Sequence, residues 1–74
     1  MNAFDHAAEV LAGFRKGLLE CERKGGAELW LIDRAGTLEF DIRQLCRDAR
    51  LAAEARDLYE RAMVLAQRKV IMRD

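Results

Sequence analysis

The sequence predicts a mainly α-helical single domain with one β-hairpin, in the order helix, strand, strand, helix. Three observations lead to this fold class: a helical apolar seam at the start, an alternating stretch with a central glycine, and a long final segment without proline or glycine. We expect a helix over 2–24, a hairpin over 27–41 and a helix over 42–73, all within one domain of 74 residues. The two helices should pack antiparallel, with the hairpin at one end.

The first helix is predicted from apolar residues that recur at alternating spacings of three and four, which place them on one helical face. Asn2 is a suitable N-cap, and Gly25-Gly26 is a suitable stop. The residues of the seam are Phe4, Ala7, Leu11, Phe14, Leu18 and Cys21.

The hairpin is predicted from a β-like pattern on both sides of a glycine-containing turn. Residues 27–32 form the expected outgoing strand, 33–36 the turn, and 37–41 the return strand. Leu38 and Phe40 alternate with polar residues, as in a strand with one buried face. Because an isolated two-stranded hairpin is marginally stable in water, we expect it to lie on the helices or to pair with a second copy.

The long final helix is the most informative feature. Asp41 to Arg73 contains neither proline nor glycine, and Asp41 with Gln44 resembles a capping box. A helix of this length would span ~50 Å, whereas a domain of this size is about 30 Å across. The surplus apolar residues must either fold back after a break in the helix or be covered by another copy or another protein. We expect a homodimer, with contacts from residues at heptad spacing: Leu51, Leu58, Leu65 and Met72.

Composition restricts the function classes. The formal net charge is zero, so no overall field attracts the chain to nucleic acid or to an anionic membrane. No apolar run approaches the ~20 residues that span a bilayer. Two cysteines without a preceding signal peptide predict a cytoplasmic protein with reduced thiols. Cys21 and Cys46 could approach each other across the hairpin, although two inert buried thiols are the favoured interpretation.

No catalytic pattern is present. The sequence has no serine, and no CxxC or HxxxH spacing indicates a metal site. We therefore predict a protein that is not an enzyme and has no cofactor or metal.

Arginines on the polar face of the final helix are the candidate partner-binding residues, together with one aromatic side chain. Arg43, Arg47 and Arg50 lie near the expected N-terminus of that helix, where cations oppose the macrodipole. They indicate either an acidic or phosphate-bearing partner or pairing within the chain, for which Glu39 and Glu22 are available. Trp30 is added because large aromatics with a polar tip are enriched at interface hot spots.

The predicted function is a non-enzymatic protein-binding module. We expect a small bacterial or phage accessory protein that binds a larger partner as a homodimer and modulates or inhibits it. The alternative is a small nucleic-acid-binding regulator or antitoxin-like dimer that uses the arginine face of the final helix.

Overall fold

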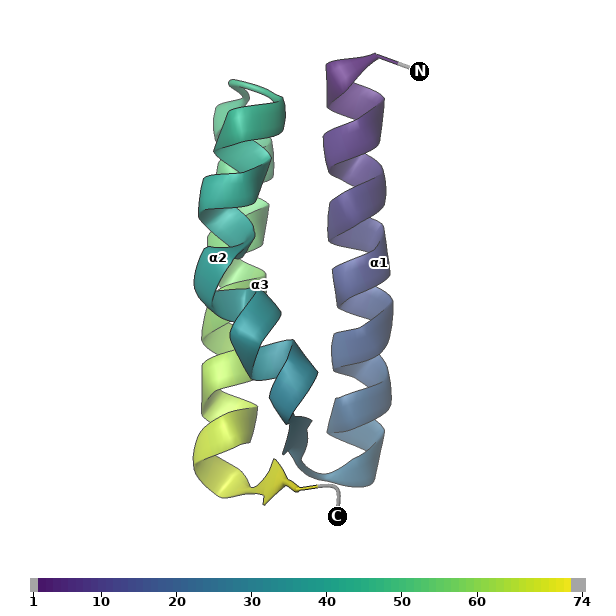
Figure 1. Ribbon diagram of the computed structural model, residues 1–74, viewed down its shortest axis with the longest axis vertical. Coiled ribbons are helices and arrows are strands. Elements are labelled where there is room, and N and C mark those ends of the chain that lie inside the picture. Colours follow the sequence, from purple (N-terminus) through teal and green to yellow (C-terminus); the bar gives the residue numbers. More distant parts are fainter. Residues whose placement is uncertain (1, 73–74) are drawn as a thin grey trace.

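Three helices form an elongated bundle in the computed structural model, which describes residues 2–72 (Figure 1). They are α1 (Ala3–Lys24), α2 (Leu29–Leu45) and α3 (Ala49–Arg68). Helices α1 and α3 run in the same direction and α2 runs in the opposite direction (Figure 1). The bundle measures 38 × 19 × 18 Å. Within the described residues, no helix is both long and apolar enough to cross a membrane.

Two short strands close one end of the bundle. Strand β1 (Ala27–Glu28) pairs in parallel with β2 (Val70–Ile71), with Ala27 opposite Val70. We call this the closed end, and we call the opposite end, where α2 turns into α3, the turn end. The chain therefore binds its α1–α2 connection to the segment that follows α3.

Helix α1 has the caps that its sequence indicates. The Asn2 side chain accepts a hydrogen bond of 2.8 Å from the amide of Asp5. Gly25 adopts φ 82°, a left-handed conformation that favours glycine, and its amide donates to the carbonyls of Cys21 and Glu22.

The hairpin prediction over 27–41 is wrong beyond residue 28, because 29–45 is helical. The buried residues of α2 are Leu31, Ala35, Leu38 and Ile42, which lie at helical spacings of four, three and four. A strand would have buried Phe40 beside Leu38, yet Phe40 is 64% exposed. Among the described residues Gly25 alone has a positive φ, so Gly36 lies within the helix and makes no turn.

The single helix predicted over 42–73 is also wrong, because the chain breaks after Leu45. Cys46 is extended, with φ −157° and ψ 130°. The Asp48 side chain then caps α3 by accepting hydrogen bonds of 2.9 Å and 3.0 Å from the amides of Arg50 and Leu51. Asp41, the expected cap, lies inside α2 and accepts a hydrogen bond from the Thr37 hydroxyl. The extended Cys46 thus ends α2, and the Asp48 side chain satisfies the first free amides of α3.

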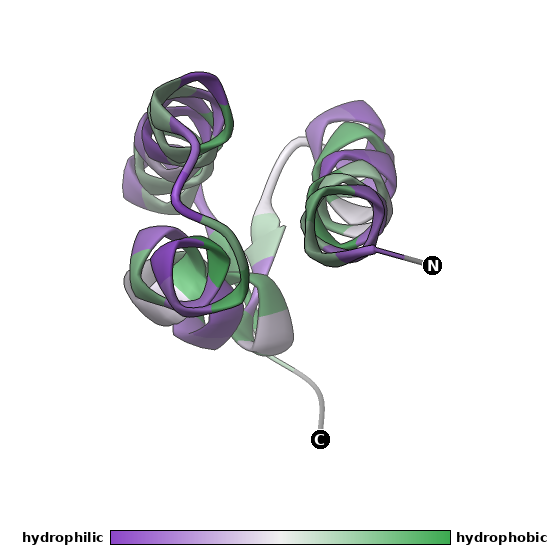
Figure 2. Cartoon of the chain, turned by 90° about the horizontal axis from the view of Figure 1, so that it is seen from above, coloured by the Kyte–Doolittle hydropathy of each residue, from purple (hydrophilic) through white to green (hydrophobic). Residues whose placement is uncertain are grey.

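This break removes the apolar surplus that predicted a dimer. The three helices surround a common axis (Figure 2), and α2 folds back along α3. Leu51, Leu58 and Leu65 are 7%, 2% and 4% exposed in the single chain, so their assignment to a dimer interface is corrected to the bundle core. Met72, the fourth predicted interface residue, lies beyond β2 and is 70% exposed. The core consists of Ala7, Leu11, Phe14, Leu18, Cys21, Ala27, Leu31, Ala35, Leu38, Ile42, Leu51, Ala55, Leu58, Ala62 and Leu65.

Candidate functional site

Trp30 combines a fixed position with an exposed ring. It is the second residue of α2, and its indole N–H donates a hydrogen bond of 2.6 Å to Glu28 Oε2. The other oxygen of that carboxylate lies 3.6 Å from the ammonium of Lys24. Because its donor is already paired, the ring can contact an apolar group without leaving a buried N–H unsatisfied. Trp30 is nevertheless 42% exposed.

The ring of Trp30 packs on a glycine of α1. Gly17 is buried, and a Cβ atom built on it would lie 2.3 Å from Cη2 of Trp30. The Trp30 ring therefore packs directly against the α1 backbone, at a position where only glycine leaves enough room. One side of the aromatic ring is held by the bundle and the rest faces outward, so little side-chain entropy would be lost on binding.

Apolar side chains, several of them exposed, lie at the closed end together with Trp30. Leu29, Trp30 and Ile71 line a shallow cavity of about 340 Å³ together with Glu28. Leu29, Val70 and Met72 are all exposed. Clustered apolar exposure next to a fixed aromatic residue is typical of a protein-binding surface.

The three candidate arginines lie together, but at the other end of the molecule. Arg43, Arg47 and Arg50 are at the turn end, where Arg43 and Arg47 line a hollow of about 570 Å³. Trp30 and Arg43 are separated by most of α2, which at 1.5 Å per residue is ~20 Å. The predicted grouping of Trp30 with the arginines into one site is therefore not what the structure shows.

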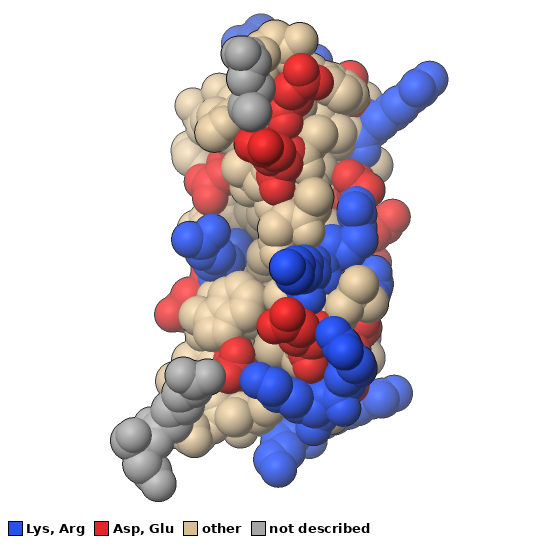
Figure 3. All heavy atoms as spheres, turned by 90° about the vertical axis from the view of Figure 1, so that its right-hand side faces the viewer, with Lys and Arg blue, Asp and Glu red and all other residues tan. Residues whose placement is uncertain are grey.

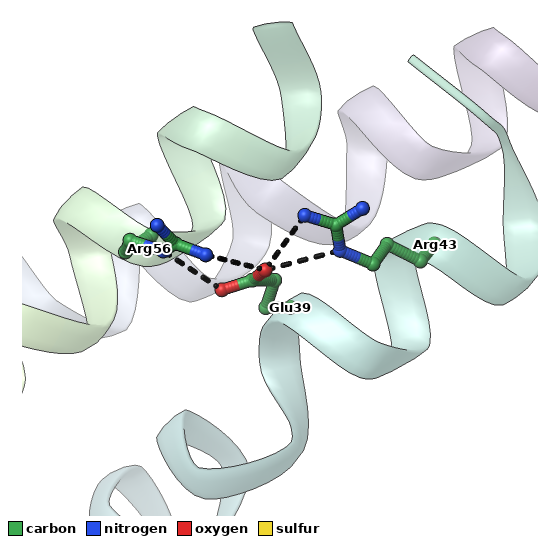
Figure 4. Close-up of polar contacts among 3 residues, drawn as sticks. All are labelled: Glu39, Arg43 and Arg56. Atoms are coloured by element: carbon green, nitrogen blue, oxygen red, sulfur yellow. Dashed lines mark hydrogen bonds and ion pairs between the residues drawn. The ribbon is translucent and has the colours of Figure 1, made fainter. Parts of the chain in front are cut away.

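Glu39 partly neutralises the arginine cluster and also joins two helices (Figure 4). It forms a salt bridge of 2.9 Å with Arg43 on its own helix and one of 3.2 Å with Arg56 on α3. The hydrogen bonds and charges of Arg56 and Arg43 hold the pKa of Glu39 below its ordinary value of 4.5. The same contacts with Glu39 raise the pKa of Arg56. The intramolecular interpretation is therefore correct for Arg43.

Arg47 and Arg50 differ from Arg43, since neither forms an ion pair with another residue in the 2–72 segment. The three arginines also do not share the N-terminal turns of one helix as expected, because Arg47 lies between α2 and α3. Arg43 lies in the last turn of α2, where a cation is favoured by the macrodipole, whereas Arg50 lies in the first turn of α3. Asp48 offsets the unfavourable position of Arg50 by capping the same helix end.

The cysteines do not form a pair. Cys21 is buried near the closed end, whereas Cys46 is partly exposed at the turn end, and both are free. Their predicted approach fails because α2 runs the length of the bundle between them. Among residues 2–72 no group of three or more His, Cys, Asp or Glu side chains could hold a metal ion.

Sequence reasoning identified Trp30 but missed the residues that hold it. Glu28 lies in a strand, as expected, but the sequence pattern assigns no role to its carboxylate, and Gly17 falls within the expected first helix without any assigned contact. The available signal was a glycine inside a strong helix seam, at a spacing that continues its buried face, since such a residue often marks a close approach.

Comparison with known proteins provides no relative: no family model, curated protein or solved structure matches the chain.

Proposed function

We propose that the chain is a non-enzymatic protein-binding module whose contact surface is centred on Trp30. The observation that carries this proposal is the exposed indole, held by Gly17 and Glu28 before any partner arrives. Preorganised tryptophans surrounded by apolar contacts are the usual hot spots of protein interfaces. In this proposal, a small bacterial or phage accessory protein binds a larger partner through its closed end and modulates or inhibits it.

The experiment compares two matched variants in an affinity capture from the native host, quantified by mass spectrometry. Leu29→Glu places a charge beside Trp30, and Phe40→Glu makes the same kind of change further along α2, at another exposed apolar position. We expect Phe40→Glu to retain the proteins captured by the wild type and Leu29→Glu to lose them. Equal capture by both variants would exclude the closed end as the binding surface.

A second candidate, nucleic-acid binding, is supported by Arg47 and Arg50 at the turn end. Figure 3 shows the side of the molecule that α1 covers, where acidic and basic side chains are interspersed and basic ones gather toward the closed end. Binding of phosphates would make affinity fall steeply with salt, by a logarithmic slope of about 0.9 per phosphate contacted. If the chain is retained on heparin at low salt and Arg47→Ala with Arg50→Ala abolishes retention, this candidate displaces the first.

A further inference from the structure

The outward side of α3 has opposite charges on the two sides of an exposed valine. Val64 is 54% exposed, with Glu60 one turn before it and Arg68 one turn after it. Residues four apart lie on the same helical face, so these three side chains form a row. Asp57 adds a second acid on the N-terminal side of the row.

Neither sign of charge in this row is neutralised by a close partner. Arg61, which could pair with Asp57 one turn away, instead donates a hydrogen bond of 2.7 Å to Glu22 on α1. Asp57, Glu60 and Arg68 form no ion pair with another residue between 2 and 72. Glu60 contributes a more distant attraction that raises the pKa of Arg56. The row therefore keeps a negative half and a positive half.

Hollows flank this row on both sides. One, of about 640 Å³, lies between α3 and the end of α1, and the other, of about 670 Å³, lies on the opposite flank of α3. Glu60 and Val64 line both. Asp57 and Arg68 also line the first hollow, and Tyr59 and Met63 line the second.

We propose that this face binds a second copy of the same chain, with the two α3 helices antiparallel and Val64 on the two-fold axis. In this register Glu60 of each copy faces Arg68 of the other, because the two residues are equally spaced from Val64. A parallel arrangement would instead place acids against acids and bases against bases. The row is thus complementary to itself in one direction, as an isologous interface requires.

The contact is small, and this determines its strength. The segment from Asp57 to Arg68 is about 18 Å long at the helical rise per residue. A single helix pair of that length buries less than a standard interface, so we expect a reversible dimer with a dissociation constant in the micromolar range. It uses the exposed side chains of α3, whereas the partner surface is centred on Trp30 of α2.

Charge reversal tests the register. Sedimentation velocity from about 10 μM to about 1 mM should show concentration-dependent dimerisation of the wild type, because the upper concentrations lie well above a micromolar dissociation constant. Glu60→Arg and Arg68→Glu should each weaken it about tenfold or more, since each creates two like-charge contacts. The double variant should recover the wild-type affinity, because it exchanges the signs and restores both pairs.

Two outcomes would overturn the proposal. One is a wild type that stays monomeric at about 1 mM, which is roughly a hundred times a dissociation constant of 10 μM. The other is a double variant that dimerises no more tightly than the single variants. Thermal unfolding of each variant checks that a loss of dimer is not a loss of fold. The charge changes are on exposed side chains, so we expect the folded state to persist.

Cross-linking tests the position of the axis. Val64→Cys in a Cys46→Ala chain places the two thiols at the two-fold, where a symmetric disulfide can form. Phe40→Cys in the same background is the matched control, since Phe40 is similarly exposed on another helix. Under mild oxidation the Val64→Cys chain should become a covalent dimer and the control should not. Equal rates for both would show that collisions, and not this interface, produce the dimer.

Discussion

The packing of Trp30 on Gly17 predicts that Gly→Ala has opposite effects on stability at two positions of α1, Gly13 and Gly17. In a helix interior, Gly→Ala stabilises by up to about 1 kcal/mol when nothing opposes the added methyl group. Gly13 on α1 has no heavy atom within 4 Å of an added Cβ, whereas at Gly17 the added Cβ would lie 2.3 Å from the Trp30 ring. Gly13→Ala should therefore stabilise the bundle and Gly17→Ala should destabilise it.

The size of the effect follows from the packing of Trp30. About half of a side chain that buries roughly 200 Å² is covered, which corresponds to ~2.5 kcal/mol at ~25 cal/mol per Å². Displacement of the ring would lose part of that contribution and about 1 kcal/mol from the hydrogen bond to Glu28. Allowing for the gain in helix propensity, we expect Gly17→Ala to lower the free energy of unfolding by about 1–2 kcal/mol.

Thermal unfolding followed by circular dichroism provides the assay. For a chain of this length 1 kcal/mol corresponds to about 6 °C, so Gly17→Ala should lower Tm by about 6–12 °C and Gly13→Ala should raise it by up to about 6 °C. Trp30 is the only tryptophan in the sequence, so its fluorescence reports the displacement directly. We expect a red shift of the emission for Gly17→Ala and no shift for Gly13→Ala.

A double variant separates the clash from other causes. In a Trp30→Ala chain the clash is absent, so Gly17→Ala should now stabilise as Gly13→Ala does. If Gly17→Ala raises Tm in the wild-type background and leaves the fluorescence unchanged, the Trp30 ring does not pack on Gly17. The proposal that Gly17 preorganises the binding surface would then be wrong.

Three further predictions concern the fold and its charges. Leu58→Ala should lower the free energy of unfolding by about 2–5 kcal/mol in denaturant titrations, and by the same amount at every protein concentration, because Leu58 is buried within its own chain. Glu39→Gln should destabilise the fold at pH 7. Because the pKa of Glu39 is lower in the folded state, the stabilisation by this carboxylate is present above pH 4.5 and is lost as the pH falls through the folded-state pKa. Urea titrations should therefore show that the difference in stability from the wild type disappears in acid. A thiol reagent should label Cys46 faster than Cys21 in the native protein, and mass spectrometry showing equal rates would contradict the burial of Cys21.

The sequence predicted the helical class and α1 more closely than the rest, because α1 has local signals at both ends: an asparagine cap and a left-handed glycine. The hairpin failed because residues 38–42 satisfy two periods at once, with Leu38 and Ile42 four apart and the intervening Phe40 also apolar. Whether the helical or the strand period holds depends on which side chains are buried, and this depends on residues far away in the sequence. The break after Leu45 was missed since neither proline nor glycine marks it, although Asp48 is a cap in its own right.

The candidate site shows the same limit. Trp30 is a candidate from its residue type and from an expected strand that is apolar on both faces; the structure has it partly exposed on a helix, and its role in binding stays a prediction. Its separation from the arginines depends on α2 being a helix, which places residues 30 and 43 at opposite ends. The sequence allows the pairing of Arg43 with Glu39, because the two residues are four apart, whereas the ion pair of Glu39 with Arg56 requires α2 and α3 to lie side by side.

The parallel pairing of β1 with β2 also affects how this protein can be handled. The amide of Ala27 donates to the carbonyl of Lys69, so the α1–α2 connection is completed by a segment that is synthesised only after α3. During translation the first two helices are made before the Lys69 carbonyl that accepts from this amide. Until β2 is made, Ile71 also does not cover the apolar surface around Trp30. Fusion tags are therefore best attached ahead of α1, whereas truncation after Arg68 should loosen the closed end first.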